Sequence, residues 1–185
     1  MNVERKVEGD RTVKEPEIPL EIERKYLIRM PDPGRLASLP GCTASKIEQT
    51  YLIAANPGET ERVRLRRYPD RVEYTHTVKV RVTSATARED ETAISESEYR
   101  ELLTRRDPAL RVVVKTRYAF YLDGQSYEVD VYPFWERTAV LETELQSEDE
   151  RPPIPPFLTL IREVTGDKNY SNRGIARRIP PEPPV

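Results

Sequence analysis

The stretch "EIERKYLI", residues 21–28, decides how the chain is interpreted. If it is a strand, Glu21, Glu23 and Lys25 share one face, because the side chains of a strand alternate between its two faces. A row of two acids and a base suits a solvated sheet face. It also suits a site that must hold metal ions and anions together, so the rest of the sequence has to separate the two hypotheses.

The composition predicts a soluble chain of one domain with balanced charge. The 185 residues are enough for one domain with a real core. Lys and Arg number 30 against 32 Asp and Glu, which gives a net charge of -2. A protein that coats nucleic acid would carry a larger excess of one sign of charge, so no stable nucleic-acid partner is expected. The chain is expected to be a monomer or a homodimer.

The compartment and the domain limits follow from local composition. A single cysteine, Cys42, excludes an internal disulfide and fits a reducing compartment. No apolar run approaches the roughly 20 residues of a membrane span, and the charged start lacks the apolar core of a signal peptide. We therefore expect a cytoplasmic protein with no membrane partner. We expect a flexible arm over 1–19, one domain over 20–179 and a Pro-rich extended tail over 180–185.

Short strand-like runs separated by turn signals dominate the domain. They cover Leu20–Ile28, Lys46–Ala54, Glu61–Tyr68, Arg71–Thr83, Glu89–Ile94, Arg111–Leu122, Ser126–Tyr132 and Ala139–Leu145. Helices are predicted at 31–39, 95–106, 155–164 and 169–179, the second beginning with Ser95 and Glu98 at capping-box spacing. Eight antiparallel strands with a few outer helices predict an α+β barrel or a sandwich.

Charged rows recur on several of these strands. In "ERVRLRRY" three arginines alternate with apolar residues, and in "YTHTVKVRV" threonines, Lys79 and Arg81 oppose valines. The same alternation gives the rows Lys115 and Arg117, Glu128 and Asp130, and Glu142 and Glu144. The apolar set of each strand must face a core, so the charged set faces bulk water or a wet interior.

The signs of these rows favour the wet interior. A solvated face usually mixes signs, because opposite charges across strands attract and like charges repel. Here the bases gather on the strands around Arg62, Lys79 and Lys115, and the acids around Glu21, Glu128 and Glu142. Acidic rows suit a hard divalent cation such as Mg²⁺ or Mn²⁺, and basic rows suit phosphate oxygens.

With these residues collected, the chain resembles the CYTH superfamily, the triphosphate tunnel metalloenzymes. The resemblance rests on Glu21-Ile22-Glu23-Arg24-Lys25, followed in order by "EQTYL", "RVRLR", "THTVK", "KTRYAF", "YEVDVY", "LETEL" and "VTGDKNYSNRGIA". It covers about Leu20 to Ile179. It implies an eight-stranded antiparallel barrel, with a few flanking helices, whose lumen is a tunnel lined by charged side chains.

The resemblance also implies roles for residues. It assigns the binding of one or two ions of Mg²⁺ or Mn²⁺ to Glu21, Glu23, Glu142 and Glu144, with Asp130 assisting. It assigns the grip on a triphosphate substrate to Lys25, Arg62, Arg64, Lys79, Lys115, Arg117 and Lys168. Catalysis is expected from Lys79 and from a carboxylate that activates water. Glu128 and Asp130 are the first candidates for that base, and Glu142 and Glu144 stay open.

One strand departs from the family pattern. Similar proteins carry Arg-x-Glu-x-Glu before the central helix, whereas "TAREDETAI" has Ala87 at the arginine position and Arg88 beside it. Either the strand bulges to bring Arg88 inward or that phosphate contact is missing. The inward placement of Glu89 and Glu91 depends on the same question.

Three other residues carry weaker expectations. His76 lies on the apolar-facing side of its strand, which favours a packed or surface histidine over a catalytic one. Cys42 has no histidine nearby in the sequence, so a nucleophilic role is not expected. Tyr51 fits a hydrogen-bonding residue of the lumen and an aromatic residue of the core equally well.

The resemblance predicts a metal-dependent hydrolase that cleaves a triphosphate, with inorganic tripolyphosphate as the expected substrate. Several alternatives stay open at the sequence level. The chain could be a nucleotide cyclase, a thiamine or nucleoside triphosphatase, or a sensor that binds polyphosphate or nucleotide without turnover.

Overall fold

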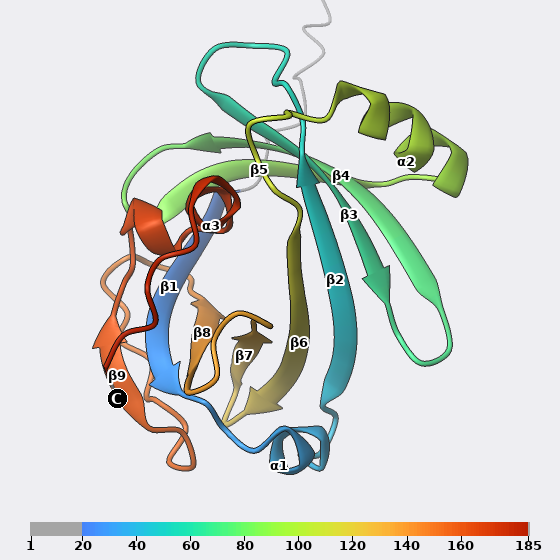
Figure 1. Ribbon diagram of the computed structural model, residues 1–185. Helices are drawn as coiled ribbons and strands as arrows, with labels where there is room; N and C mark the ends of the chain where they lie inside the picture. Colours follow the sequence, from blue (N-terminus) through green and yellow to red (C-terminus); the bar gives the residue numbers. More distant parts are fainter. Residues whose placement is uncertain (1–19, 185) are drawn as a thin grey trace, which may run out of the picture.

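A computed structural model describes residues 20–184, so the expected arm over 1–19 lies outside the described residues. Nine strands form one sheet (Figure 1). Their bounds are β1 Leu20–Arg29, β2 Thr43–Tyr51, β3 Glu59–Arg67, β4 Val72–Arg81, β5 Thr86–Ala93, β6 Val113–Leu122, β7 Gln125–Val131, β8 Thr138–Glu144 and β9 Leu160–Glu163. All eight predicted strands are present, with ends shifted by a few residues.

The sheet closes into a barrel because β1 pairs on both sides. Its order is β5-β4-β3-β2-β6-β7-β8-β1-β9, with an additional pairing between β5 and β1. Residues 20–22 of β1 pair with β5, and residues 23–29 pair with β8, both antiparallel. The predicted eight-stranded antiparallel barrel is therefore confirmed, and the sandwich is excluded.

The predicted helix over 155–164 is wrong, because this segment contains β9. Beyond Ile22, strand β5 no longer covers the edge of β1, and buried backbone groups there need partners. The N–H of Val164 donates to the carbonyl of Lys25 at 2.8 Å, and β9 pairs with Tyr26 to Ile28. A free strand edge therefore decides the conformation of this segment against its helix-like spacing of apolar residues.

The helices are short and lie outside the sheet or at its end (Figure 1). Helix α1 (Pro33–Ala37) is capped by Asp32, and α2 (Glu96–Leu102) has the predicted capping box of Ser95 and Glu98. The remaining turns are the 3₁₀ segments η1 (Leu103–Arg105) and η2 (Lys168–Tyr170), and α3 spans Asn172–Arg177. No helix of the described residues is long and apolar enough to cross a membrane.

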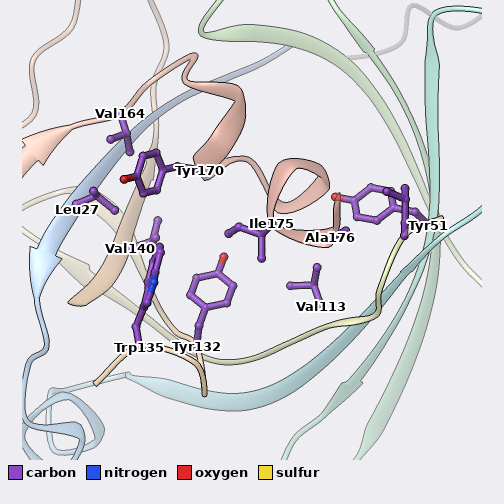
Figure 2. Packing of buried hydrophobic residues seen from close by; sticks show 11 residues of the cluster. Leu27, Tyr51, Val113, Tyr132, Trp135, Val140, Val164, Tyr170, Ile175 and Ala176 are labelled. Carbon is purple, nitrogen blue, oxygen red and sulfur yellow. The ribbon is translucent and has the colours of Figure 1, made fainter. Parts of the chain in front are cut away.

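Helix α3 closes one end of the barrel. Figure 2 shows Ile175 and Ala176 of this helix among inward-facing side chains, including Tyr51 of β2, Val113 of β6 and Tyr132, which follows β7. All five are at most 4% exposed. We call this end the plugged mouth. Two further apolar clusters lie on the outer faces of the strands, one of them under α2.

A charged lumen as the candidate active site

The charged rows face the interior of the barrel. Lys25, Lys115, Arg117, Asp130 and Glu142 are each at most 8% exposed, although charged groups are rarely buried without partners. A solvated sheet face would leave them open to water. The charged rows therefore face the interior of the barrel and not bulk water, and we call this charged interior the lumen.

Asp130 is at the centre of a first group of ion pairs, on β6 to β8. The Nζ of Lys115 lies 2.5 Å from its Oδ2, and the Nε of Arg117 donates to its Oδ1 at 2.7 Å. Arg117 also donates to Glu142 at 2.6 Å and pairs with Glu128. Burial alone would raise the pKa of Asp130, but Arg117 and Lys115 hold it below its ordinary value.

Lys25 joins this group from β1. Its Nζ lies 2.6 Å from a carboxylate oxygen of Glu142 and 3.7 Å from Glu23. Burial opposes the charged form of Glu142, yet Lys25, Arg117 and Lys115 together keep its pKa well below the ordinary value. Both partners therefore stay ionised in the closed lumen.

A second group of ion pairs spans β3, β4, β5 and β1. Lys79 pairs with Glu21 and, at 2.7 Å, with Glu89. Arg62 donates to Glu89 at 2.8 Å, and Arg64 donates to Glu91 at 2.6 Å. Residues far apart in the sequence are thus brought to one surface, as the charged rows predict.

The lumen keeps an excess of acid near β1. Burial and the neighbouring carboxylate of Glu23 raise the pKa of Glu21 to about 7, although Lys79 opposes the shift. Burial also raises the pKa of Glu128, against the effect of Arg117. Glu23 lies directly across from Glu144 on β8. The carboxylates of Glu23 and Glu89 repel that of Glu21, and an added cation would relieve this repulsion.

The oxygen donors of the lumen would hold a divalent cation together with the phosphate oxygens of a substrate. No group of three or more acidic, histidine or cysteine side chains within 20–184 is arranged to hold a metal ion by itself. Mg²⁺ is commonly bound through one or two carboxylates together with phosphate oxygens and water. The crowded acids Glu21, Glu23 and Glu144 fit that kind of shared site.

The pairing of strand β5 shows whether Ala87 or Arg88 faces the lumen. The register between β4 and β5 runs without a shift from Thr75 opposite Ala93 to Arg81 opposite Ala87. No bulge turns Arg88 inward. Arg88 lies outside the barrel, where it lines an open cavity of about 370 Å³ with His76 and Asp90. The inner-face arginine is therefore missing from this strand.

Two predicted site residues lie at the margin of the lumen. Glu144 ends β8 and is exposed. Lys168, on η2, is also exposed, and its ammonium makes no ion pair within the described part of the chain.

The sequence analysis did not predict that the uncharged residues Ser45 and Gln49 of β2 line the lumen. Gln49 is 1% exposed and donates to the hydroxyl of Tyr51 at 2.7 Å, so Tyr51 is both a hydrogen-bonding residue and part of the apolar plug. Ser45 accepts a hydrogen bond at 2.9 Å from Arg66, the third arginine of the row predicted on β3. The residues Ser45, Ile47, Gln49 and Tyr51 alternate along β2 and so share one face. None of them is charged, so the pattern of charged rows could not identify this face as part of the lumen.

The two other singled-out residues lie away from the lumen. The Nε2 of His76 lies 2.9 Å from the carboxylate of Glu61, which also accepts from Arg105 on the outer face of the sheet. Cys42 is a free, half-buried thiol beside an outer apolar cluster.

Comparison with known proteins places the chain in a family. An inorganic triphosphatase from Nitrosomonas europaea is 32% identical over 162 residues, which cover 86% of this chain and 99% of that protein. The chain belongs to the CYTH superfamily. No protein-family model matches it.

Solved structures agree with this CYTH assignment. The crystal structure of an inorganic triphosphatase matches with a TM-score of 0.50 and 32% identity, covering 86% of this chain and 96% of that one. A protein from Pyrococcus horikoshii matches with a TM-score of 0.51 and 23% identity over 70% of this chain and 80% of that one, which shows the fold alone.

Proposed function

We propose that this CYTH protein is a metal-dependent triphosphatase that hydrolyses inorganic tripolyphosphate to pyrophosphate and phosphate. The observation that carries the proposal is the closed barrel whose lumen buries acidic and basic side chains in direct contact with one another. Similarity to the inorganic triphosphatase from Nitrosomonas europaea supports the choice of substrate. We also propose a cytoplasmic location, which the free thiol of Cys42 supports.

The basic side chains would bind the triphosphate. Arg62, Arg64, Lys79, Lys115 and Arg117 converge from β3, β4 and β6, and their acid partners hold them in place before substrate arrives. Lys25 and Lys168 would complete the set. Phosphoryl transfer needs positioning and charge stabilisation more than covalent help, so a preorganised cationic lumen is a sufficient device. Lys79 would stabilise the charge that develops in the transition state.

The acidic side chains would bind Mg²⁺ or Mn²⁺ together with the substrate. The proposed ligands are Glu21, Glu23, Glu142 and Glu144, with Asp130 assisting. When bound, such an ion neutralises phosphate charge and lowers the pKa of a bound water. Asp130 and Glu142 each pair with both a lysine and an arginine. Glu21 and Glu23 each pair with one lysine, and Glu144 makes no ion pair within residues 20–184, so these three are better placed to exchange partners.

A carboxylate of the lumen would accept the proton of the attacking water. Glu128 is the first candidate, because burial already raises its pKa toward the range of a general base. Asp130 has both oxygens bonded to cations, which suits it to orienting Lys115 and Arg117. We therefore propose Glu128 as the base and Asp130 as the residue that supports the basic side chains.

A panel assay tests the proposal. Phosphate release is measured from tripolyphosphate, thiamine triphosphate and ATP, with detection of cyclic nucleotide, in Mg²⁺ and in excess EDTA. We expect the fastest release from tripolyphosphate and none in EDTA. Cyclic nucleotide as the main product, or undiminished turnover in EDTA, would contradict the proposal.

A matched pair of variants links the activity to the lumen. Lys79→Ala removes a charged phosphate contact worth about 1.5–3 kcal/mol, so kcat/KM should fall by roughly one to two decades. Arg88→Ala removes a base from the outer face of the adjacent strand and should leave kcat/KM unchanged. Equal effects in the two variants would place the substrate outside the lumen.

A further inference from the structure

The position of α3 leaves one mouth of the lumen as the entrance. Ile175 and Ala176 fill the end near Tyr51, which lies opposite Arg62 across the β2–β3 ladder. Arg66 lies four residues further along β3, opposite Ile47 and away from the plug. Its side chain shares the inner face with Arg62 and Arg64. Arg66 therefore lies toward the end of the lumen that α3 does not fill.

Arg66 differs from the basic residues deeper in the lumen. Lys25, Arg62, Arg64, Lys79, Lys115 and Arg117 each pair with a carboxylate. The guanidinium of Arg66 is half-buried and donates to the hydroxyl of Ser45, itself 3% exposed, at 2.9 Å. Within residues 20–184 no carboxylate lies within 4 Å of it. Its charge is therefore available to a ligand.

The surroundings of Arg66 carry an excess of positive charge. Burial lowers the pKa of Arg64, and the nearby Arg62, Arg117 and Arg66 add to the effect, although Glu91 opposes it. Arginines that repel one another at the end of a closed lumen favour an anion at that end.

The same mouth offers little to an organic group. On the side of Ser45 away from α3, the inner-face residues Thr43 and Ala119 are small and lie opposite each other. The nearby ring of Tyr68 is covered by the guanidinium groups of Arg66 and Arg71, whose central carbons lie 5.0 and 3.7 Å from its centre. A nucleobase or thiazolium ring would have to displace these charges before it could stack.

We propose that Arg66 selects inorganic tripolyphosphate over triphosphate esters. Tripolyphosphate carries an ionisable terminal phosphate at both ends, whereas the corresponding phosphate of ATP or thiamine triphosphate is esterified and carries less charge. Arg66 binds the terminal phosphate at the entrance, with Ser45 holding the guanidinium in place. This inference rests on the proposed function, since it names the substrate class of the same lumen.

Binding measurements separate this role from turnover. The dissociation constants of the imido analogues of tripolyphosphate and of ATP, which resist hydrolysis, are measured with Mg²⁺ by calorimetry. Wild type should bind the tripolyphosphate analogue at least about tenfold more tightly. Arg66→Gln should weaken that analogue by about tenfold or more, as expected for one lost charge-assisted contact, and change the ATP analogue by less than about twofold.

The neighbouring arginine is the matched control. Arg67 points to the outer face and its side chain is 52% exposed, so Arg67→Gln should leave both constants unchanged. Equal weakening of both analogues in Arg66→Gln, or no change in either, would overturn the assignment. A wild-type protein that shows the expected binding without hydrolysing tripolyphosphate would retain the role of Arg66 and remove the proposed function instead.

Discussion

At the scale of single residues, the lumen holds its carboxylates in two electrostatic states. Glu89 is surrounded by Arg62 and Lys79, which keep its pKa below the ordinary value despite burial. Glu21 shares Lys79 with Glu89, but burial and Glu23 raise its pKa to about 7. The same lysine therefore cannot neutralise both acids, and one of them is left with unrelieved repulsion.

This difference predicts that Glu21→Gln and Glu89→Gln change the free energy of unfolding in opposite directions. Because the folded pKa of Glu21 is about 7 and the ordinary value is 4.5, the folded state holds a proton that the unfolded state has lost. The stabilisation that the folded state gains from protonated Glu21 is fully present below pH 4.5 and is lost as the pH rises through 7. At pH 8 without metal, Glu21→Gln should raise the free energy of unfolding by about 1–2 kcal/mol.

Urea denaturation at pH 5 and pH 8 in EDTA measures the effect. The gain of Glu21→Gln should be largest at pH 8 and smaller at pH 5. Glu89→Gln is the control of opposite sign, since its ionised form is stabilised by Arg62 and Lys79, and it should lose stability at pH 8. A loss of stability in both variants at pH 8 would show that Glu21 carries no unfavourable charge.

The sequence predicts which residues face the lumen better than it predicts their partners. Alternation alone places Lys25, Lys115 and Glu142 on one surface, because the apolar residues between them need a core. The choice between Ala87 and Arg88 could not be made this way, since the strand is polar on both faces and a bulge would exchange them. Only the register with β4 decides it.

At the scale of elements, the plug depends on a close approach between η2 and α3. A β-carbon on Gly174 would lie 1.9 Å from the carbonyl oxygen of Lys168, a distance that no side chain can accept. The same two elements are joined by Ser171, whose hydroxyl donates to Lys168 and accepts from Gly174. Glycine is required here by space, and its φ is not among the positive values.

Gly174→Ala should therefore loosen the plug. The backbone of η2 must move, and Ile175 and Ala176 lose their contacts with the inner faces of the strands. We expect a loss of about 1–3 kcal/mol in the free energy of unfolding, as for overpacking of a tight site. Faster hydrogen exchange in α3 than in β2 or β6 would locate the effect. Arg177→Ala, on the exposed side of α3, is the control and should change neither quantity.

Elements with local signals were predicted, and elements defined by distant partners were not. The capping box of α2 is visible in the sequence because Ser95 and Glu98 are three residues apart. Strand β9 has no such signal. Its conformation follows from the edge of β1, which lies more than a hundred residues away in the sequence.

At the scale of the whole molecule, the closed barrel couples ligand binding to folding. The charged inner side chains come from every strand of the barrel except β2, so metal and polyphosphate can relieve their mutual repulsion only when the barrel is closed. Ligands that bind only the folded state raise its stability by mass action, by about 2.7 kcal/mol at a hundredfold excess over the dissociation constant. A solvated sheet face would show no such effect, because exposed charges interact weakly and are screened by salt.

A thermal shift series tests this coupling with metal, tripolyphosphate and both together. We expect the largest rise in melting temperature with both, and a smaller rise with tripolyphosphate alone, because its charge then faces Glu21 and Glu23 uncompensated. Lys25→Glu should keep the response to metal and lose the additional response to tripolyphosphate. The substitution removes the base that pairs with Glu142 and adds an acid to the row of Glu21 and Glu23. Arg24→Lys, on the opposite face of β1, keeps a positive charge outside the lumen and should respond like wild type. A melting temperature that stays flat under all three conditions would show that the charged rows do not form a binding site for metal and polyphosphate.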